Sequence, residues 1–509
     1  MLSKVFSYGL LGIDAYPIEI EVDISNGLPA LTLVGLADTA IRESKERVKS
    51  AIKNSGFNWP IARITVSLAP SDIKKEGAAF DLAIALGILS ATGQLNSKSI
   101  KEYQILGELS LDGSLRPIRG TLPICIAMSK SSKDIIIPAQ NAKEAAVISG
   151  VSVWPIKTLK ETVEFLNNPR VSKPFKIELK DSLQHDSDYH LDFSEVKGQY
   201  FAKRAIEIAV SGGHNILMVG PPGSGKTMLA KRIPTIMPDL TVEEALEVTK
   251  IHSIMGTLPK NTGLMSLRPF RNPHHSISSV ALVGGGSEPK PGEISLSHQG
   301  VLFLDELPEF NRGCLESLRQ PMEDGSIHVS RIKRSFIFPA CFMLVSAMNP
   351  CPCGYYTDPK RTCRCNPNKI LNYMGKISGP LLDRIDIQIE LPAIKYRELS
   401  DTKNAESSEE IKKRVEKARI TQTQRFKSDK IFSNARMNIR LIKKYCLLND
   451  DAKELLKMAI VELGFSARAY DKVLKVSRTI ADLEESENIK AEHISEAIQY
   501  RSLDRQSFY

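Results

Sequence analysis

The sequence predicts an α/β protein made of three parts joined in series. Residues 1–172 alternate short β-like runs with helical ones. Residues 192–394 hold a glycine-rich loop between an apolar run and a helix-compatible stretch. Residues 395–509 have helical periodicity, few glycines and no strand alternation. We therefore expect an N-terminal α/β domain, a polar linker over residues 173–191, a central domain with a parallel sheet, and a C-terminal helical bundle.

The first part is predicted in most detail by its apolar periodicity. The turn signals Asn26-Gly27 and Asp112-Gly113 separate its runs. We expect strands at residues 18–24, 31–34 and 61–68, and helices at residues 38–55 and 78–92. Residues 173–190 then turn polar and charged without periodicity, as a linker does.

Composition excludes several classes of protein. No apolar stretch approaches the roughly 18 residues that a spanning helix needs, so we expect no membrane partner. Asp14 and Glu19 interrupt the region where a secretory signal would have its apolar core. We therefore expect a cytoplasmic protein. Its eight cysteines do not predict disulfides in that compartment.

The formal charge of +9 is concentrated in one stretch. From Glu409 to Lys444 there are twelve Lys or Arg residues against four Asp or Glu residues. Such a stretch is typical of a surface that binds a polyanion. A solvated helix face has the same composition, and charge alone does not separate these two interpretations.

The glycine-rich loop matches the pattern G-x-x-x-x-G-K-[ST]. It follows the apolar run at residues 215–219 and precedes the helix-compatible residues 228–233, the context that this motif requires. Inward-pointing backbone N–H groups and a helix N-terminus bind phosphate there. We expect ATP at this loop, with Lys226 at the β- and γ-phosphates and the Thr227 hydroxyl on Mg²⁺. The residues assigned to the nucleotide are Gly220, Pro221, Pro222, Gly223, Ser224, Gly225, Lys226 and Thr227.

A second motif completes this site. Four apolar residues, Val301–Leu304, predict a buried strand that delivers Asp305 and Glu306 to its carboxyl end. Open parallel sheets bind ligands at that edge. Asp305 is expected to support Mg²⁺, and Glu306 to deprotonate the attacking water. A glutamate after the metal-site aspartate favours an ATP hydrolase over a passive nucleotide binder.

Four cysteines lie close together in the sequence, at Cys351, Cys353, Cys363 and Cys365. Two pairs at this spacing can supply four thiolates to a structural Zn²⁺. The C-x-C spacing is tighter than is usual, but Pro352 and Gly354 allow a sharp turn. The alternative is a set of free thiols on a loop.

With these motifs, the chain resembles the YifB/ComM family of magnesium-chelatase-like AAA+ ATPases over essentially its whole length. The stretches that carry the resemblance are Arg268-Pro-Phe-Arg-Asn-Pro-His-His275, Ala281-Leu-Val-Gly-Gly-Gly286, Pro291-Gly-Glu-Ile-Ser295 and Asp305-Glu-Leu-Pro-Glu-Phe310. The resemblance implies three more site residues. Asn349 would be the sensor that polarises the attacking water, and Arg384 the finger that reaches a neighbouring subunit's γ-phosphate. Arg468 would be a second sensor in the helical lid.

A finger that acts on a neighbour requires a ring, and related ATPases form hexamers. The resemblance also implies a pore hairpin at residues 323–338, whose tip residues Arg331, Lys333 and Arg334 would bind DNA phosphates. An exposed basic turn is the alternative. Because adjacent histidines point apart on most backbones, we interpret His274 and His275 as structural or insertion-loop residues.

The N-terminal part resembles the Lon-type proteolytic domain but lacks its catalytic pair. Ala79 stands where the nucleophilic serine should be, and Leu122 stands near the position of the lysine base. A methyl group cannot attack a carbonyl, so we expect an inactive protease domain.

The function that these features predict is a hexameric, Mg²⁺- and ATP-dependent DNA motor. The resemblance implies a helicase or branch-migration factor that acts on single-stranded or branched DNA in natural transformation. A chelatase-like ATPase and a protein-remodelling ATPase are the alternatives.

Overall fold

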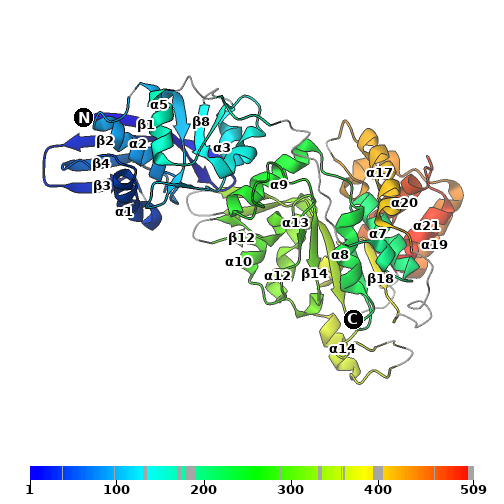
Figure 1. Ribbon diagram of the computed structural model, residues 1–509. Helices are drawn as coiled ribbons and strands as arrows, with labels where there is room; N and C mark the ends of the chain where they lie inside the picture. Colours follow the sequence, from blue (N-terminus) through cyan, green and yellow to red (C-terminus); the bar gives the residue numbers. More distant parts are fainter. Residues whose placement is uncertain are drawn as a thin grey trace. The chain divides into compact units, whose positions relative to one another are not determined.

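The computed structural model describes residues 1–36, 38–96, 98–129, 134–168, 173–177, 191–286, 289–330, 335–356, 358, 361–393, 405–429, 431–463 and 465–501. The chain forms two compact units (Figure 1). The first consists of Met1–His185 and Thr241–Ser266, and the second of Asp186–Leu240 and Leu267–Tyr509.

Within the described ranges, the first unit is built on a seven-stranded mixed sheet of order β3-β4-β2-β1-β5-β8-β9. Strands β1, β2 and β4 pair antiparallel, whereas the remaining neighbours pair parallel. The strands are β1 (Leu2–Leu11), β2 (Asp14–Ser25), β3 (Ala30–Val34), β4 (Arg63–Ala69), β5 (Tyr103–Ile105), β8 (Asp134–Pro138) and β9 (Val153–Ile156).

The helices of this unit include one that is apolar on every side. Helix α2 (Asp81–Ala91) is buried along its whole length and packs against β1 and β2, as expected for a core helix without a polar face. The other helices are α1 (Thr39–Asn54), α3 (Thr121–Met128), α4 (Ala142–Ala146) and α5 (Leu159–Asn167). The structure confirms the α/β class and the strands and helices expected in this part, and it adds β1, β5, β8 and β9.

Helix α9 (Val242–Met255) also belongs to the first unit, although it comes much later in the chain. The Ser253 hydroxyl donates a 2.5 Å hydrogen bond to the buried Glu144 carboxylate. Lys250 forms a 2.7 Å ion pair with Asp14, and the Gly120 N–H donates to the Ser253 carbonyl. Burial raises the pKa of Glu144. The first unit is therefore completed by a helix from the chain segment that follows the glycine-rich loop.

The second unit has a parallel sheet, as the sequence predicts. In the part of the chain that the structure describes, this sheet has five strands in the order β11-β14-β17-β10-β18, all parallel. The three inner strands are buried at every position. Its strands are β11 (Phe270–Arg271), β14 (Val301–Leu304), β17 (Met343–Met348), β10 (Ile216–Val219) and β18 (Ile387–Glu390). Their carboxyl ends meet at one edge, where ligand sites form.

Helices and a hairpin surround this sheet. Helix α8 (Lys226–Ile236) is the next element after β10, and α7 (Tyr200–Gly212) precedes that strand. Strands β15 (Ser326–Ser330) and β16 (Ser335–Pro339) form an antiparallel hairpin with Val329 opposite Phe336. Short helices are α10 (Ser279–Val283), α11 (Glu293–Leu296), α12 (Arg312–Ser317), α13 (Arg319–Asp324), α14 (Pro367–Met374) and α15 (Gly379–Leu382).

The C-terminal part of the second unit is helical, as expected. Its helices share one core with the sheet and with α7 and α8. They are α17 (Ser408–Arg425), α18 (Ile439–Tyr445), α19 (Asp450–Leu463), α20 (Ala467–Leu483) and α21 (Ala491–Gln499).

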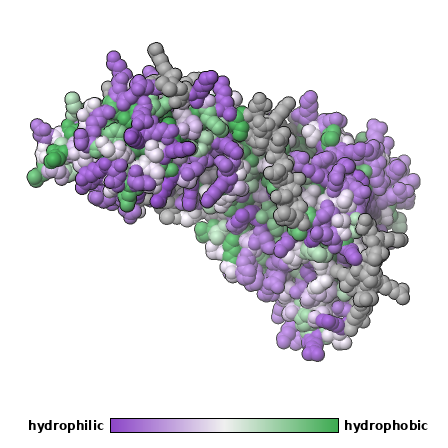
Figure 2. Space-filling model, in the orientation of Figure 1, coloured by the Kyte–Doolittle hydropathy of each residue, from purple (hydrophilic) through white to green (hydrophobic). Residues whose placement is uncertain are grey.

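Figure 2 shows many hydrophilic residues on the face in view, with apolar residues scattered among them. Among the described residues, no helix combines the length and the apolar character that crossing a membrane requires.

Candidate nucleotide site and cysteine cluster

The glycine-rich loop connects the end of β10 to the start of α8. Gly223 and Gly225 have φ angles of 79° and 89°, in the left-handed region that glycine adopts without steric cost. Gly225 caps α8, so the helix begins at Lys226 and its free N–H groups face the loop. This is the local geometry that binds a phosphate group.

Lys226 lies against the loop and is 8% exposed. Its Nζ donates to the carbonyl oxygens of Gly220 at 2.7 Å and Pro221 at 2.9 Å. The same atom lies 3.3 Å from Oδ1 of Asn349, which follows the end of β17. Burial lowers the pKa of Lys226, and the Asp305 carboxylate opposes that shift. The structure therefore brings together the lysine and the residue expected to polarise water.

The two residues expected to hold Mg²⁺ are in direct contact. The Thr227 hydroxyl donates to Oδ2 of Asp305 at 2.8 Å. Thr227 lies in the first turn of α8, and Asp305 follows the last residue of β14. A hydroxyl and a carboxylate are hard oxygen ligands, the kind that Mg²⁺ prefers together with phosphate oxygens. This donor pair fits a magnesium ion bound with a nucleotide.

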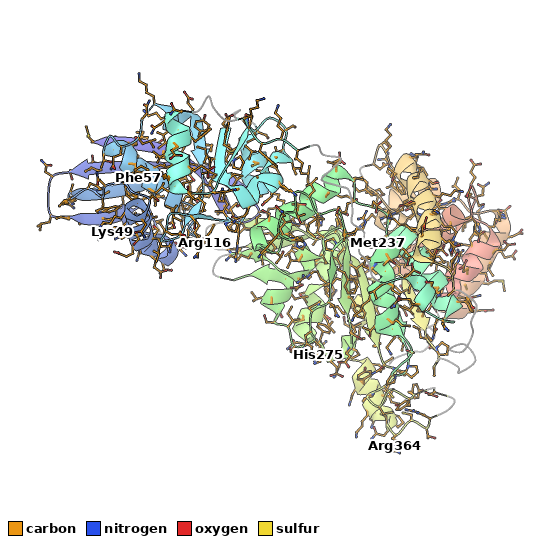
Figure 3. The ribbon with its side chains drawn as sticks, viewed as in Figure 1. Lys49, Phe57, Arg116, Met237, His275 and Arg364 are labelled. Atoms are coloured by element: carbon orange, nitrogen blue, oxygen red, sulfur yellow. The ribbon has the colours of Figure 1, made fainter. Side chains whose placement is uncertain are left out.

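Glu306 adopts a left-handed backbone conformation, with φ of 54°, and its side chain contacts a histidine. His275 Nδ1 lies 3.3 Å from Oε2 of Glu306. Figure 3 labels His275, which follows β11. The parallel ladder pairs Phe270 with Val301 and Arg271 with Leu302, so the residues that follow β11 and β14 leave the sheet at the same edge.

Our interpretation of the two histidines was therefore wrong in one respect. Their rings do not point apart, because the centroids lie 4.1 Å apart with planes tilted by 34°. His275 also meets the edge of Phe310, the last residue of the Asp305-Glu-Leu-Pro-Glu-Phe310 motif. Sequence reasoning missed His275 as a neighbour of the expected general base.

Of the two arginines implied by the resemblance, Arg384 lies in the segment 383–386 and Arg468 contacts that segment through Asp383. The Arg384 guanidinium forms a 2.5 Å ion pair with Glu323 and donates to the Pro380 carbonyl at 2.6 Å. Arg468, from α20, lies 3.9 Å from Asp383. Within the described residues, these contacts of Arg384 and Arg468 are made to residues outside the glycine-rich loop. The buried Asp386 pairs with Lys472, which ties α20 to the same segment.

The four cysteines converge into one cluster. Their sulfur atoms lie within 4.8 Å of one another, and the three pairs among Cys351, Cys353 and Cys363 are 3.3, 3.5 and 3.7 Å apart. A disulfide needs about 2.05 Å, whereas four sulfurs at 2.3 Å from a tetrahedral zinc lie about 3.8 Å apart. Backbone N–H groups of Tyr355 and Arg364 lower the pKa of Cys353 to about 6. The donor set and its spacing fit Zn²⁺ better than free thiols on an open loop.

The residues expected to bind DNA, Arg331, Lys333 and Arg334, lie outside the described residues. The ladder of β15 and β16 on either side of them is the hairpin that the sequence predicts.

Apolar side chains stand at both positions of the missing protease pair. Ala79 packs against a core cluster that includes Ile118 and Ile124, and Leu122 is fully buried. Cys125, in the same cluster, is also buried, and burial raises the pKa of its thiol. A buried thiol with a raised pKa is a poor nucleophile.

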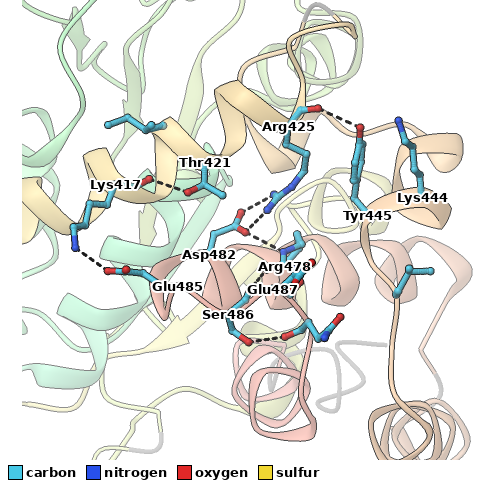
Figure 4. Close-up of a pocket in the computed structure, with 13 residues that line it drawn as sticks. Lys417, Thr421, Arg425, Lys444, Tyr445, Arg478, Asp482, Glu485, Ser486 and Glu487 are labelled. Atoms are coloured by element: carbon cyan, nitrogen blue, oxygen red, sulfur yellow. Dashed lines mark hydrogen bonds and ion pairs between the residues drawn. The ribbon is translucent and has the colours of Figure 1, made fainter.

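A cavity of about 620 Å³ lies among the C-terminal helices (Figure 4). Arg425 and Arg478 line it, and both form ion pairs with the buried Asp482. Lys417 pairs with Glu485 at 2.8 Å. Elsewhere on α17, Arg414 pairs with Glu207 and Glu406. Arg414, Lys417 and Arg425 of the basic stretch are thus paired with carboxylates of the chain, which favours the solvated-face interpretation for these three residues.

Comparison with known proteins agrees with this geometry. Residues 192–399 match the family described as magnesium chelatase, subunit ChlI, and residues 20–141 and 405–501 match two further ChlI families. The chain is 44% identical to competence protein ComM of Haemophilus influenzae over 506 residues, covering 99% of this chain and 98% of ComM. Protein YifB of Escherichia coli is also 44% identical, with the same coverage.

A third relative covers only part of the chain. Lon protease 2 of Bacillus subtilis is 29% identical over 179 residues, which is 32% of each chain. The two relatives matched over their full length decide the family. This chain belongs to the YifB/ComM family of magnesium-chelatase-like AAA+ ATPases.

Proposed function

We propose that this AAA+ ATPase is a cytoplasmic hexameric motor that uses ATP and Mg²⁺ to move on single-stranded or branched DNA. Its role would be helicase or branch-migration activity that promotes DNA integration in natural transformation. The observation that carries the DNA role is similarity over nearly the whole length to a protein named for competence, the capacity to take up DNA. The contact of Thr227 with Asp305 beside the glycine-rich loop supports the ATPase role.

The proposed chemistry assigns one task to each residue. The loop from Gly220 to Gly225 and Lys226 would hold the phosphates, while Thr227 and Asp305 would hold Mg²⁺. Bound Mg²⁺ would neutralise charge on the phosphate oxygens. Glu306 would accept a proton from the attacking water, which Asn349 would orient. Arg384 and Arg468 would stabilise the charge of the transferring phosphoryl group. A structural Zn²⁺ would occupy the cysteine cluster.

A branch-migration assay tests the proposed function. A synthetic three-strand junction with one labelled strand is incubated with the protein, Mg²⁺ and either ATP or no nucleotide. We expect displacement of the labelled strand only with ATP, and faster ATP turnover when DNA is present. Turnover that DNA does not change, together with an intact junction, would contradict the DNA role.

A chelatase-like role is the second candidate, since the matched families are described by a magnesium chelatase subunit. Stimulation of ATP turnover by porphyrin-binding partner proteins, and not by DNA, would favour it. Stimulation by unfolded protein would favour a remodelling role.

Arg384 is expected to act on the neighbouring subunit's nucleotide. Arg384→Ala should bind ATP normally but hydrolyse it about 1000-fold more slowly, as loss of an arginine finger does. Mixing Arg384→Ala subunits with Lys226→Ala subunits should restore part of the turnover. The second variant supplies an intact finger to the intact nucleotide site of the first. A mixture as inactive as its components would exclude action between subunits.

Three basic residues at the hairpin tip are expected to bind DNA phosphates. Replacing Arg331, Lys333 and Arg334 by alanine should weaken DNA binding and reduce the slope of log K against log[salt] by about 2, at roughly 0.7 per single-strand contact. Fluorescence anisotropy at several salt concentrations measures this slope. A matched control removes the same charge from Arg440, Lys443 and Lys444 in α18. An equal effect of the control would exclude a specific role for the hairpin.

A further inference from the structure

The cysteine cluster begins two residues after Asn349 and packs on the nucleotide loop. Cys351 is fully buried, and its carbonyl accepts a hydrogen bond from the Gly354 N–H at 2.9 Å. Gly354 has φ of 84°, and a Cβ atom there would lie 2.5 Å from Cδ of Pro222. The backbone of the cluster therefore rests directly on a residue of the phosphate-binding loop.

A second connection between the cluster and Asn349 runs through the helix that follows Cys365. Helix α14 starts two residues after Cys365, and the Asn366 side chain caps it by accepting from the Lys369 N–H at 2.8 Å. Tyr373, near the end of α14, is 6% exposed. The backbone of Asn349 acts on the Tyr373 hydroxyl and partly opposes the rise that burial causes in the pKa of Tyr373. Asn349 thus has the cluster close along the chain and α14 beside it.

The bound metal would determine how rigidly these two connections hold Asn349. Among its described residues, the segment from Cys351 to Cys365 has no helix or strand, so bonds from four sulfurs to one ion would be the main cross-link of that part. Without the ion, no metal–sulfur bonds join the four cysteines. The turn at Gly354 and the start of α14 are then no longer cross-linked to each other. Displacement of a positioned catalytic group by about 1 Å can cost about 100-fold in rate.

We propose that Zn²⁺ bound by Cys351, Cys353, Cys363 and Cys365 positions Asn349, so that ATP hydrolysis by this protein requires zinc. The proposal rests on the ATPase function proposed above. Zinc takes no part in the reaction itself. Its loss is expected to lower kcat with little change in ATP affinity, because the backbone of residues 220–225 and Lys226 still bind the phosphates.

The test compares the full-length protein before and after zinc is removed with a chelator selective for zinc over magnesium. Zinc content, the Kd for a fluorescent ATP analogue, kcat and the thermal melting curve are each measured. We expect about one zinc per chain and a kcat at least about tenfold lower after removal, with Kd changed less than about threefold. Adding Zn²⁺ back, with no other change, should restore kcat.

Three variants separate metal binding from positioning. The double variant Cys363→Ser, Cys365→Ser should lose zinc and kcat together. Tyr373→Phe should keep its zinc and its ATP affinity but lose several-fold in kcat, because the hydroxyl that lies beside the Asn349 backbone is removed. This variant keeps the test decisive if the double variant does not fold. Cys341→Ser, a cysteine outside the cluster, is the matched control and should keep both zinc and kcat.

Two results would overturn the proposal while leaving the ATPase function intact. One is less than about 0.3 zinc per chain in active protein purified without chelator. The other is zinc-free protein that hydrolyses ATP at the original rate. Zinc-loaded wild-type protein that binds the ATP analogue but never hydrolyses ATP would instead overturn the proposed function, and this proposal with it.

Discussion

Replacing Glu306 by glutamine is expected to slow ATP hydrolysis about 100-fold or more while ATP still binds. The amide keeps the size and polarity of the side chain but cannot accept a proton from water. ATP affinity should hardly change, because Lys226, Thr227 and Asp305 are untouched. Single-turnover hydrolysis and the binding of a fluorescent ATP analogue measure the two effects separately.

The matched control for this variant is Glu309→Gln, which makes the same change three residues away. Glu309 forms an ion pair with Lys376 at 3.1 Å. It has no role in the proposed chemistry, so we expect near-normal turnover. Equal rates for wild type and Glu306→Gln would show that another group is the general base. His275, which contacts Glu306, would then be the first residue to replace.

Lys226→Ala is expected to weaken ATP binding about 100- to 1000-fold and so to abolish turnover at ordinary ATP concentrations. A hydrogen bond to a charged group contributes about 1.5–3 kcal/mol, and Lys226 is expected to bind two phosphate groups. Titration with a fluorescent ATP analogue gives the Kd directly.

Lys231→Ala is the control for this change, because Lys231 lies on the same helix α8 and is exposed. It removes the same charge without touching the loop and should bind ATP normally. If Lys226→Ala bound ATP as tightly as this control, the loop would not be the nucleotide site.

Much of the geometry of the candidate nucleotide site could be predicted, because its residues follow strands that the sequence marks clearly. The apolar residues Val301–Leu304 form β14 with the predicted bounds, and the glycine-rich loop lies between β10 and α8. Local pattern is sufficient here, since the glycine-rich loop is built from consecutive residues and the carboxyl ends of parallel strands meet at one edge.

The contact of His275 with Glu306 could not be predicted in the same way. It depends on the pairing of β11 with β14, and β11 is only two residues long. So short a strand has no periodicity to detect. The short strand β5 was missed for the same reason. Strand β1 was missed although it is ten residues long, because polar residues such as Ser3 and Ser7 are buried along it and blur its alternation.

The placement of α9 has a practical consequence for dividing the protein. The first unit is made of two separate chain segments, residues 1–185 and residues 241–266. If the protein is cut at the linker, the N-terminal fragment therefore lacks helix α9, which belongs to its own unit. The other fragment would carry Val248 and Ile251 of that helix, both buried in the intact chain, into water. Either fragment expressed alone should therefore be unstable or aggregate. A truncated protein that keeps the first unit must contain both residues 1–185 and residues 241–266.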